Sequence, residues 1–135
     1  MTQQASNIIG KDVKNDKGEA FGKVDDIIII DGQAQYLILS HGGLLGIGKT
    51  LVPVPFQRAD VTEDAVVLRD VDKQMLEKAP NIDKDELRTL GEPEFEGKIY
   101  GYYGEEPAHR MRGIKEDRMR QQPGQKQEQK EVPKQ

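Results

Sequence analysis

The sequence predicts a small, mostly β, barrel-like domain that is followed by a polar tail. Three observations lead to this fold class. Short runs of apolar and β-branched residues recur through residues 8–68, turn-forming residues separate them, and after residue 68 the chain becomes polar and helix-forming. Short strands at this spacing, joined by tight turns, are typical of a β-meander that closes on itself, and closure removes exposed sheet edges.

Three strands are expected in the first half of the domain, over residues 8–13, 21–30 and 35–40. The dipeptide Asp31-Gly32 lies between the second and third strands, and it is a strong signal for a two-residue hairpin. The second strand ends in four consecutive isoleucines, residues 27–30. Such an apolar run predicts a strand that is buried on both faces or that crosses the barrel.

Further strands are expected over residues 50–56, 60–62 and 65–68. Pro53 and Pro55 lie within the first of them. Because proline has no N–H to donate to a β-ladder, this strand is predicted to lie at a sheet edge or to contain a bulge.

Short helices are predicted after the strands. Asp72 is a suitable N-cap for a helix over residues 73–78, which ends before Pro80. Asp83 is a suitable N-cap for a second helix over residues 84–90. Both helices are too short to be stable unless they pack on the barrel.

Three of the four tyrosines lie in one segment, at Tyr100, Tyr102 and Tyr103. We expect them to form a C-terminal anchor whose rings pack on the barrel or on another subunit, with partner recognition as the alternative. The acidic Glu105 and Glu106 follow directly, and their charge disfavours a platform for stacking nucleic-acid bases.

Charge is distributed unevenly along the chain. Residues 1–107 carry 12 Lys and Arg against 20 Asp and Glu, whereas residues 108–135 carry 8 against 4. The acidic body argues against nucleic-acid binding by the folded part, while the basic tail leaves RNA association open. Residues 108–135 are expected to be a charged, disordered tail, although residues 108–122 have the propensity for a helix.

The chain has no cysteine, which excludes disulfides and thiolate metal sites. Residues 1–7 are expected to be flexible, and they lack the basic run and apolar stretch of a secretory signal. No apolar run near the N-terminus is long enough to span a membrane. A cytoplasmic protein without a transmembrane segment is therefore expected.

Several segments, taken in order, resemble the PRC-barrel family, which is named after the cytoplasmic domain of the photosynthetic reaction-centre H subunit. They include IGKDV at residues 9–13, QYLILS at 35–40, GLLGIGK at 43–49 and VPVPF at 52–56. The resemblance covers roughly residues 8–80. It implies a partly open antiparallel β-barrel of about five or six strands. It also implies that residues 81–107 form the C-terminal extension of stand-alone bacterial members, packed on the barrel or on a subunit. Known members act as scaffolds.

Residues 43–50 match the phosphate-binding consensus G-x-x-x-x-G-K-[ST]. That loop must open a helix so that backbone N–H groups face the phosphates, and Pro53 and Pro55 prevent a helix here. We therefore predict a connection between two antiparallel strands, either tucked into the barrel mouth or exposed to a partner. Its candidate interaction residues are His41, Leu44, Leu45, Ile47 and Lys49.

No catalytic or metal-binding set is recognisable, and no cofactor is predicted. His41 and His109 have no companion ligands at metal spacing, and the neighbours Ser40 and His41 point to opposite sides of a strand. The leading hypothesis is a non-catalytic interaction or scaffold module that acts through the barrel surface on an unidentified protein partner, as a homo-oligomer. Two alternatives stay open. They are a small-ligand or anion-binding module at residues 42–49, and an RNA- or ribosome-associated factor that uses the basic tail.

Overall fold

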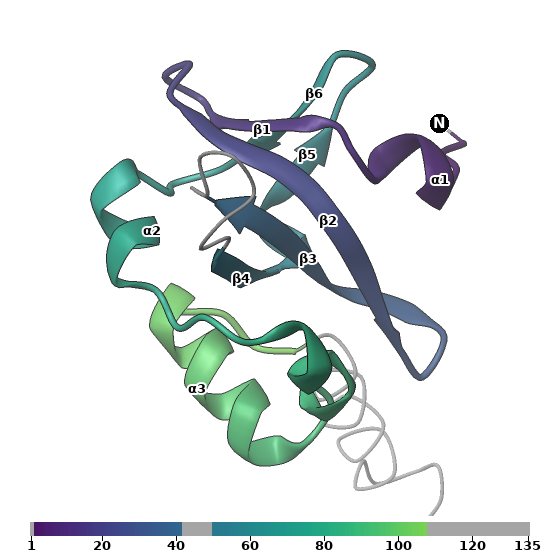
Figure 1. The fold of residues 1–135 in the computed structure, drawn as a ribbon, viewed down its shortest axis with the longest axis vertical. Coiled ribbons are helices and arrows are strands. Elements are labelled where there is room, and N and C mark those ends of the chain that lie inside the picture. Colours follow the sequence, from purple (N-terminus) through teal and green to yellow (C-terminus); the bar gives the residue numbers. More distant parts are fainter. Residues whose placement is uncertain (1, 42–49, 108–135) are drawn as a thin grey trace, which may run out of the picture. The chain divides into compact units, whose positions relative to one another are not determined.

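A six-stranded, strongly curved sheet forms the body of the molecule, with short helices beside it (Figure 1). The computed structural model describes residues 2–41 and 50–107. In chain order the strands and helices are α1 (Ala5–Ile8), β1 (Asp12–Asn15), β2 (Ala20–Ile30), β3 (Gln33–His41), β4 (Thr50–Pro55), the 3₁₀ turn η2 (Phe56–Arg58), β5 (Ala59–Val61), β6 (Ala65–Leu68), α2 (Lys73–Lys78), the 3₁₀ helix η3 (Lys84–Thr89) and α3 (Pro93–Tyr103).

The strands are hydrogen-bonded in the order β4-β3-β2-β1-β6-β5, so the sheet does not close into a complete ring. This confirms the predicted class of a small, partly open, mostly β barrel. One pairing differs from the expected antiparallel arrangement, because β1 and β6 run parallel, with Val13 opposite Val66. Only strands joined by a tight turn are constrained to be antiparallel. These two lie far apart in the sequence, so no hairpin sets their direction.

The hairpin between β2 and β3 forms where the sequence predicts it. Asp31 and Gly32 both have positive φ, at 52° and 80°, as a type I′ turn requires. At the other end of the β2–β3 ladder the two backbones approach closely at Gly22. The φ of Gly22 is 147°, and a Cβ added there would lie 2.0 Å from the Ser40 carbonyl oxygen. A glycine is therefore required at the point where the two strands meet most closely.

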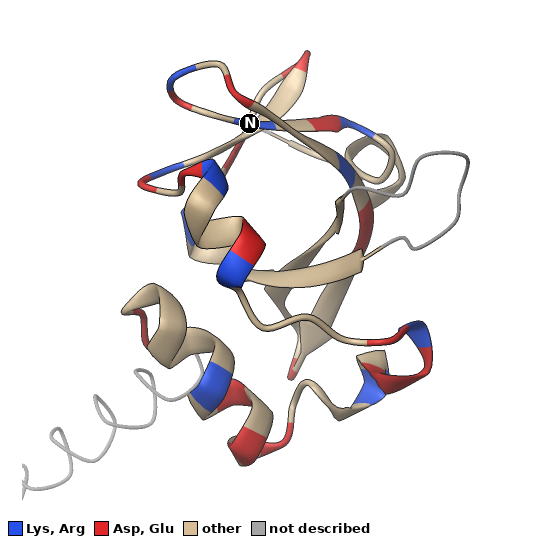
Figure 2. Cartoon of the chain, turned by 60° about the vertical axis from the view of Figure 1, so that its left-hand side comes forward, with Lys and Arg blue, Asp and Glu red and all other residues tan. Residues whose placement is uncertain are grey.

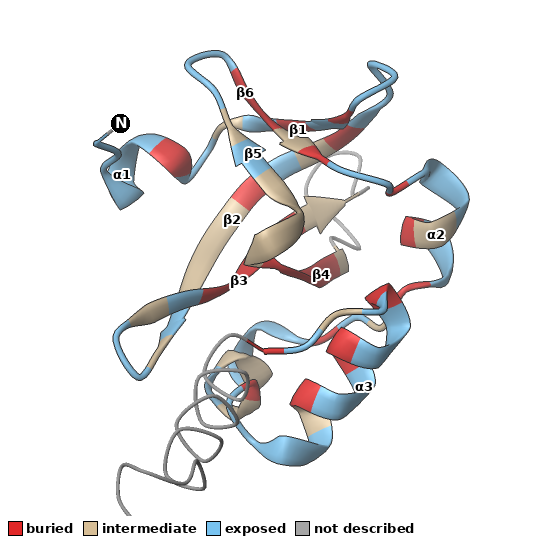
Figure 3. Cartoon of the chain, turned by 180° about the vertical axis from the view of Figure 1, so that it is seen from behind, coloured by how far each residue is buried: buried red, intermediate tan, exposed pale blue. Residues whose placement is uncertain are grey.

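The hydrophobic core is centred on β3. Residues 35–39 are all buried. Helix α3 packs on the sheet beside β3 and contacts both β3 and β4 (Figure 3). Tyr36 and Tyr100 meet edge to face at 5.3 Å between ring centroids, a favourable geometry for aromatic rings. The described residues up to Glu105 belong to one compact unit.

The position of β4 follows from its prolines. Among the described strands it pairs with β3 alone and is thus an edge strand, as predicted from Pro53 and Pro55. Its outer side is met by an isolated bridge, in which the N–H of Ile82 donates to the carbonyl of Leu51 at 3.0 Å.

The helices differ from the sequence prediction in three places. Residues 5–8 form a helical turn, so the strand expected over residues 8–13 begins only at Asp12. The helix expected over residues 84–90 is a 3₁₀ helix, a form common in short connecting pieces. Helix α3 was not predicted, because Gly97 and Gly101 lower its propensity and its stability comes from packing. Helix α2 has the predicted bounds, with the Asp72 side chain accepting from the Met75 N–H.

The isoleucine run of β2 contradicts the prediction of burial on both faces. Ile29 is 63 % exposed, and residues 27, 28 and 30 are only partly buried. The reason is tertiary, because this end of β2 projects toward the hairpin tip, where Figure 3 shows intermediate and exposed residues.

Candidate functional site

The exposed end of β2 forms one wall of a surface groove of about 890 Å³. The opposite wall is η3 together with Gly91. Residues that line it are Asp26, Ile27, Ile28, Ile29, Ile30, Lys84, Asp85, Leu87, Arg88 and Gly91. The groove thus combines aliphatic side chains from both walls with charged side chains beside them.

The wall formed by η3 is held in place by local hydrogen bonds. A capping box joins Asp83 and Glu86 at its start, in which the N–H of Asp83 donates to Glu86 Oε1 at 2.9 Å. At its end the Thr89 hydroxyl donates to the Glu86 carbonyl at 2.6 Å. The chain then passes against β2, since a Cβ added at Gly91 would lie 3.5 Å from Ile30 Cδ1. The Ile30 side chain of the β2 wall therefore lies close to the backbone of the opposite wall at Gly91.

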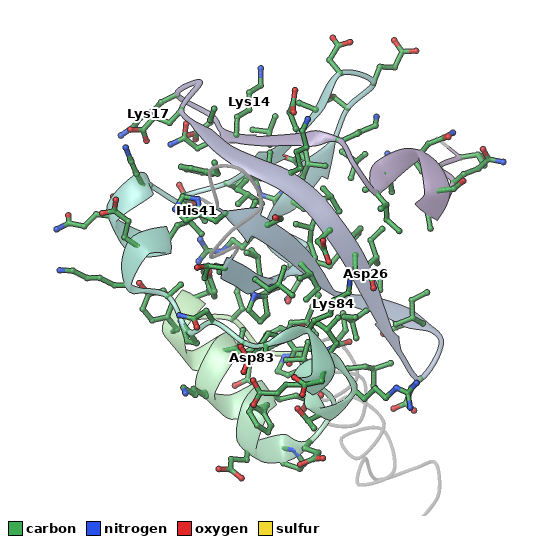
Figure 4. All side chains as sticks on the ribbon, viewed as in Figure 1. Lys14, Lys17, Asp26, His41, Asp83 and Lys84 are labelled. Atoms are coloured by element: carbon green, nitrogen blue, oxygen red, sulfur yellow. The ribbon has the colours of Figure 1, made fainter. Side chains whose placement is uncertain are left out.

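Four charged side chains line the groove, and none of them forms an ion pair within the described part of the chain. Ion pairs in that part join Lys23 to Asp12, Arg58 to Glu105 and Arg69 to Asp60. Asp26 of β2 and Lys84 of η3 lie on the two walls (Figure 4). Figure 2 shows both basic and acidic residues on the short η3 helix.

The Asp26 carboxylate is directed by its own strand. Its Oδ1 accepts a hydrogen bond from the Ile27 N–H at 2.7 Å. A bulge in the β2–β3 ladder lies at this point, between Val24 and Asp26. Bulges re-aim side chains, and here the bulge is followed directly by the four isoleucines.

The loop residues singled out from the sequence fall largely outside the described residues. Leu44, Leu45, Ile47 and Lys49 lie there, so their assignment as an interaction loop stays a prediction. His41 is described, at the end of β3, with Nδ1 2.7 Å from the Phe21 carbonyl oxygen. That contact ties the histidine ring to β2.

The three C-terminal tyrosines lie on α3 and have different surroundings. Tyr100 is buried, and its hydroxyl donates to the Gln35 carbonyl of β3 at 2.6 Å. Tyr103 is also buried, and its hydroxyl has no hydrogen-bond partner among the described residues. Tyr102 is 36 % exposed, and its hydroxyl donates to the Met75 carbonyl at 2.5 Å.

Burial has an electrostatic consequence for two of these phenols. The pKa of Tyr100 is raised well above its usual value, first by burial and then by the nearby Glu96 carboxylate. The pKa of Tyr103 is also raised, mainly by burial, with a further contribution from Tyr102. Both hydroxyls therefore stay protonated at physiological pH.

Arg58, which the sequence analysis did not single out, connects β5 and β6 to the end of α3. Its Nε pairs with Glu105 at 2.7 Å, and its guanidinium also donates to the carbonyls of Arg69, Asp70 and Tyr103. The planar fork of arginine suits several acceptors at once. The only sequence signal is an arginine next to a short strand, which does not identify its distant partners.

Within residues 2–41 and 50–107, no group of three or more potential ligand side chains is arranged to hold a metal ion. Over the same residues, the structure contains no helix with the length and apolarity to cross a membrane.

A comparison with models of protein families gives a match. The family model of the PRC-barrel domain matches residues 2–75, which is more than half of the chain. The matched region contains β1 to β6 and the wall of the groove that β2 forms. No curated protein matches the chain.

Proposed function

The chain belongs to the PRC-barrel family, and from this premise we propose that it is a non-catalytic protein-interaction module that acts through the surface of its barrel. The observation that carries the proposal is the groove between β2 and η3, with Ile29 63 % exposed. PRC-barrel domains commonly mediate protein interactions.

The apolar content of the groove supports a protein partner. Single exposed apolar residues are ordinary on protein surfaces, whereas a contiguous apolar strip beside charged residues is typical of an interaction site. Here four consecutive isoleucines of β2 and Leu87 of η3 line the same depression. Aliphatic side chains surrounded by charges match the general composition of a protein–protein interface.

The chemistry of the lining supports binding over catalysis. Among the described residues that line the groove there is no histidine, serine, threonine or tyrosine. Its ionisable groups are two carboxylates, one ammonium and one guanidinium. The raised pKa values described above belong to Tyr100 and Tyr103, which lie on α3 inside the core and not in the groove. Those phenols are held by packing, away from solvent.

The test is chemical cross-linking of the full chain in an extract of the native cell. Lys84 provides an amine on the wall of the groove, while Lys14 of β1 and Lys17 of the β1–β2 turn provide amines elsewhere (Figure 4). Wild type is compared with Ile29→Glu and with Ile9→Glu, a matched control at another exposed isoleucine, 42 % exposed.

We expect cross-links from Lys84 to a protein in the wild type and in Ile9→Glu, and their loss in Ile29→Glu, because a buried carboxylate is strongly unfavourable in an apolar interface. An unchanged set of cross-links in all three proteins contradicts the proposal. A cross-link from Lys84 to any protein counts, whether to another chain of this sequence or to a different one.

A further inference from the structure

We propose that the partner that occupies the groove is a second copy of this chain, related by a two-fold axis, so that the β2 wall of each copy meets the η3 wall of the other. This inference rests on the proposed function and names its partner. A two-fold interface uses one surface patch twice, so that patch must be complementary to itself.

The two walls have opposite charge. The β2 wall contributes Asp26, with a charge of −1, whereas the η3 wall contributes Lys84, Asp85 and Arg88, with a net charge of +1. A two-fold rotation places Asp26 of each copy opposite Lys84 and Arg88 of the other. The dimer therefore contains this set of opposite charges twice. Since none of these groups has an ion-pair partner among the described residues, each is available to an incoming chain.

The groove is neutral on a body that is acidic. Residues 1–107 carry 20 acidic against 12 basic side chains, so most surfaces of one copy repel the same surface of another. The groove has two of each sign and avoids that repulsion. An acidic body also makes this neutral groove a poor match for nucleic acid or for an anionic lipid surface.

The aliphatic residues supply the core of such an interface. Ile29 is exposed, and Ile27 and Leu87 are partly buried beside it. In the proposed two-fold arrangement the isoleucines of each copy cover Leu87 of the other, and the charged side chains of the two walls form the rim. Interfaces of this kind have an apolar centre and a polar edge.

The sheet edges offer a less suitable route for self-association. At β4 the Leu51 carbonyl already accepts from Ile82, and Pro53 and Pro55 have no N–H to donate. The opposite edge is β5, which has only three residues. Pairing of strands between copies is therefore limited at both edges of the described sheet, and the groove remains.

The experiment uses charge reversal in the full chain. One variant is Asp26→Arg, and a second is Lys84→Glu with Arg88→Glu. The control is Lys14→Glu on β1 with Lys17→Glu on the β1–β2 turn. Molar mass is measured by sedimentation over a series of concentrations, and circular dichroism verifies that each variant is folded.

We expect wild type and the control to reach twice the mass of one chain. Each charge-reversal variant alone is expected to associate on the order of 100-fold more weakly, because it places like charges opposite each other twice. When the two variants are mixed, both pairs of opposite charge are restored, and the mixture is expected to regain the two-chain mass. A change that only damages the fold does not recover on mixing.

Three results overturn the inference. They are a one-chain mass for wild type at every soluble concentration, two-chain association that both variants retain, and folded variants that do not associate when mixed. If wild type stays a single chain while Lys84 still cross-links to a different protein in the cell extract, the second-copy inference fails and the proposed interaction role stands.

Discussion

Strands β2 and β3 are neighbours in one ladder and both are rich in branched apolar residues, yet the structure uses them differently. Residues 36–39 of β3 are fully buried at 0 % exposure, whereas residues 27–30 of β2 are exposed or only partly buried. The difference lies in what covers each strand. Helix α3 packs beside β3, whereas the end of β2 faces η3 across the groove. An apolar strand therefore stabilises the fold where another element packs on it, and it forms an exposed surface where it does not.

In the β2–β3 ladder, the largest loss of stability is expected from a substitution of Gly22. Gly22→Ala places a Cβ 2.0 Å from the Ser40 carbonyl oxygen at a φ of 147°. The backbone conformation and the overpacking together are expected to lower the free energy of unfolding by roughly 4 kcal/mol. Urea denaturation measures the loss, and Gly18→Ala is the control, because its added Cβ meets nothing within 4 Å. Equal losses of unfolding free energy in both variants contradict the close approach of Gly22 to the Ser40 carbonyl.

Truncation of one residue on each strand separates the two roles. Leu37→Ala removes a fully buried side chain and is expected to cost about 3 kcal/mol of unfolding free energy. Ile29→Ala removes an exposed one and is expected to change stability by less than about 0.5 kcal/mol. Chemical denaturation of dilute samples measures both, so that association does not contribute. A loss at Ile29 as large as that at Leu37 refutes the distinction between the strands.

The contrast between β2 and β3 also shows what the sequence is able to predict. The Asp31-Gly32 hairpin, the Asp72 cap and the edge position of β4 depend on residues close in sequence, and each is confirmed. The burial of residues 27–30 was predicted wrongly, because periodicity reports apolar character and not what packs against it. The groove needs η3, which lies more than 50 residues further along.

Two other features depend on non-local packing in the same way. The parallel pairing of β1 with β6 has no local signal, because no turn connects these strands directly. Helix α3 contains Gly97 and Gly101 and is formed against β3 and β4. The charges of the groove are visible in the sequence, but their position on two facing walls is not.

The packing of α3 beside β3 is tested by a substitution of Arg58, whose side chain binds the end of α3. Arg58→Ala deletes the ion pair with Glu105 and the hydrogen bonds that hold the end of α3. Because both side chains are partly exposed, at 15 % and 28 %, we expect a loss of about 2 kcal/mol rather than the larger value of a fully buried pair. Arg69→Ala removes an exposed pair with Asp60 and serves as the control, with less than about 1 kcal/mol expected. Thermal unfolding of both variants measures the two losses of stability.

A smaller effect than that at Arg58 is expected at Tyr103. Its buried hydroxyl has no hydrogen-bond partner among the described residues, so Tyr103→Phe is expected to raise stability by about 1 kcal/mol at neutral pH. Burial raises its pKa above the usual value of 10.0. Above that pH the unfolded chain releases a proton that the folded chain retains, so stability falls as pH rises.

The phenylalanine variant removes this dependence. Between pH 10 and 11 its stability is expected to fall by about 1 kcal/mol less than that of wild type, because the unfolded tyrosine is only partly ionised at pH 10. Urea denaturation at several alkaline pH values measures the slope. Identical slopes for variant and wild type contradict the assignment of a raised pKa to Tyr103.

The central claim is that the isoleucines of β2 form a contact surface while those of the core do not. NMR spectra of the full chain, labelled at the isoleucine δ1 methyl groups and recorded over a dilution series, test it most directly. We predict that the signals of Ile27 and Ile29 move with concentration, while those of buried Ile38 and of Ile9, exposed on another surface, stay fixed. Signals of Ile27 and Ile29 that do not change on dilution, or that change no more than those of Ile9, contradict the account.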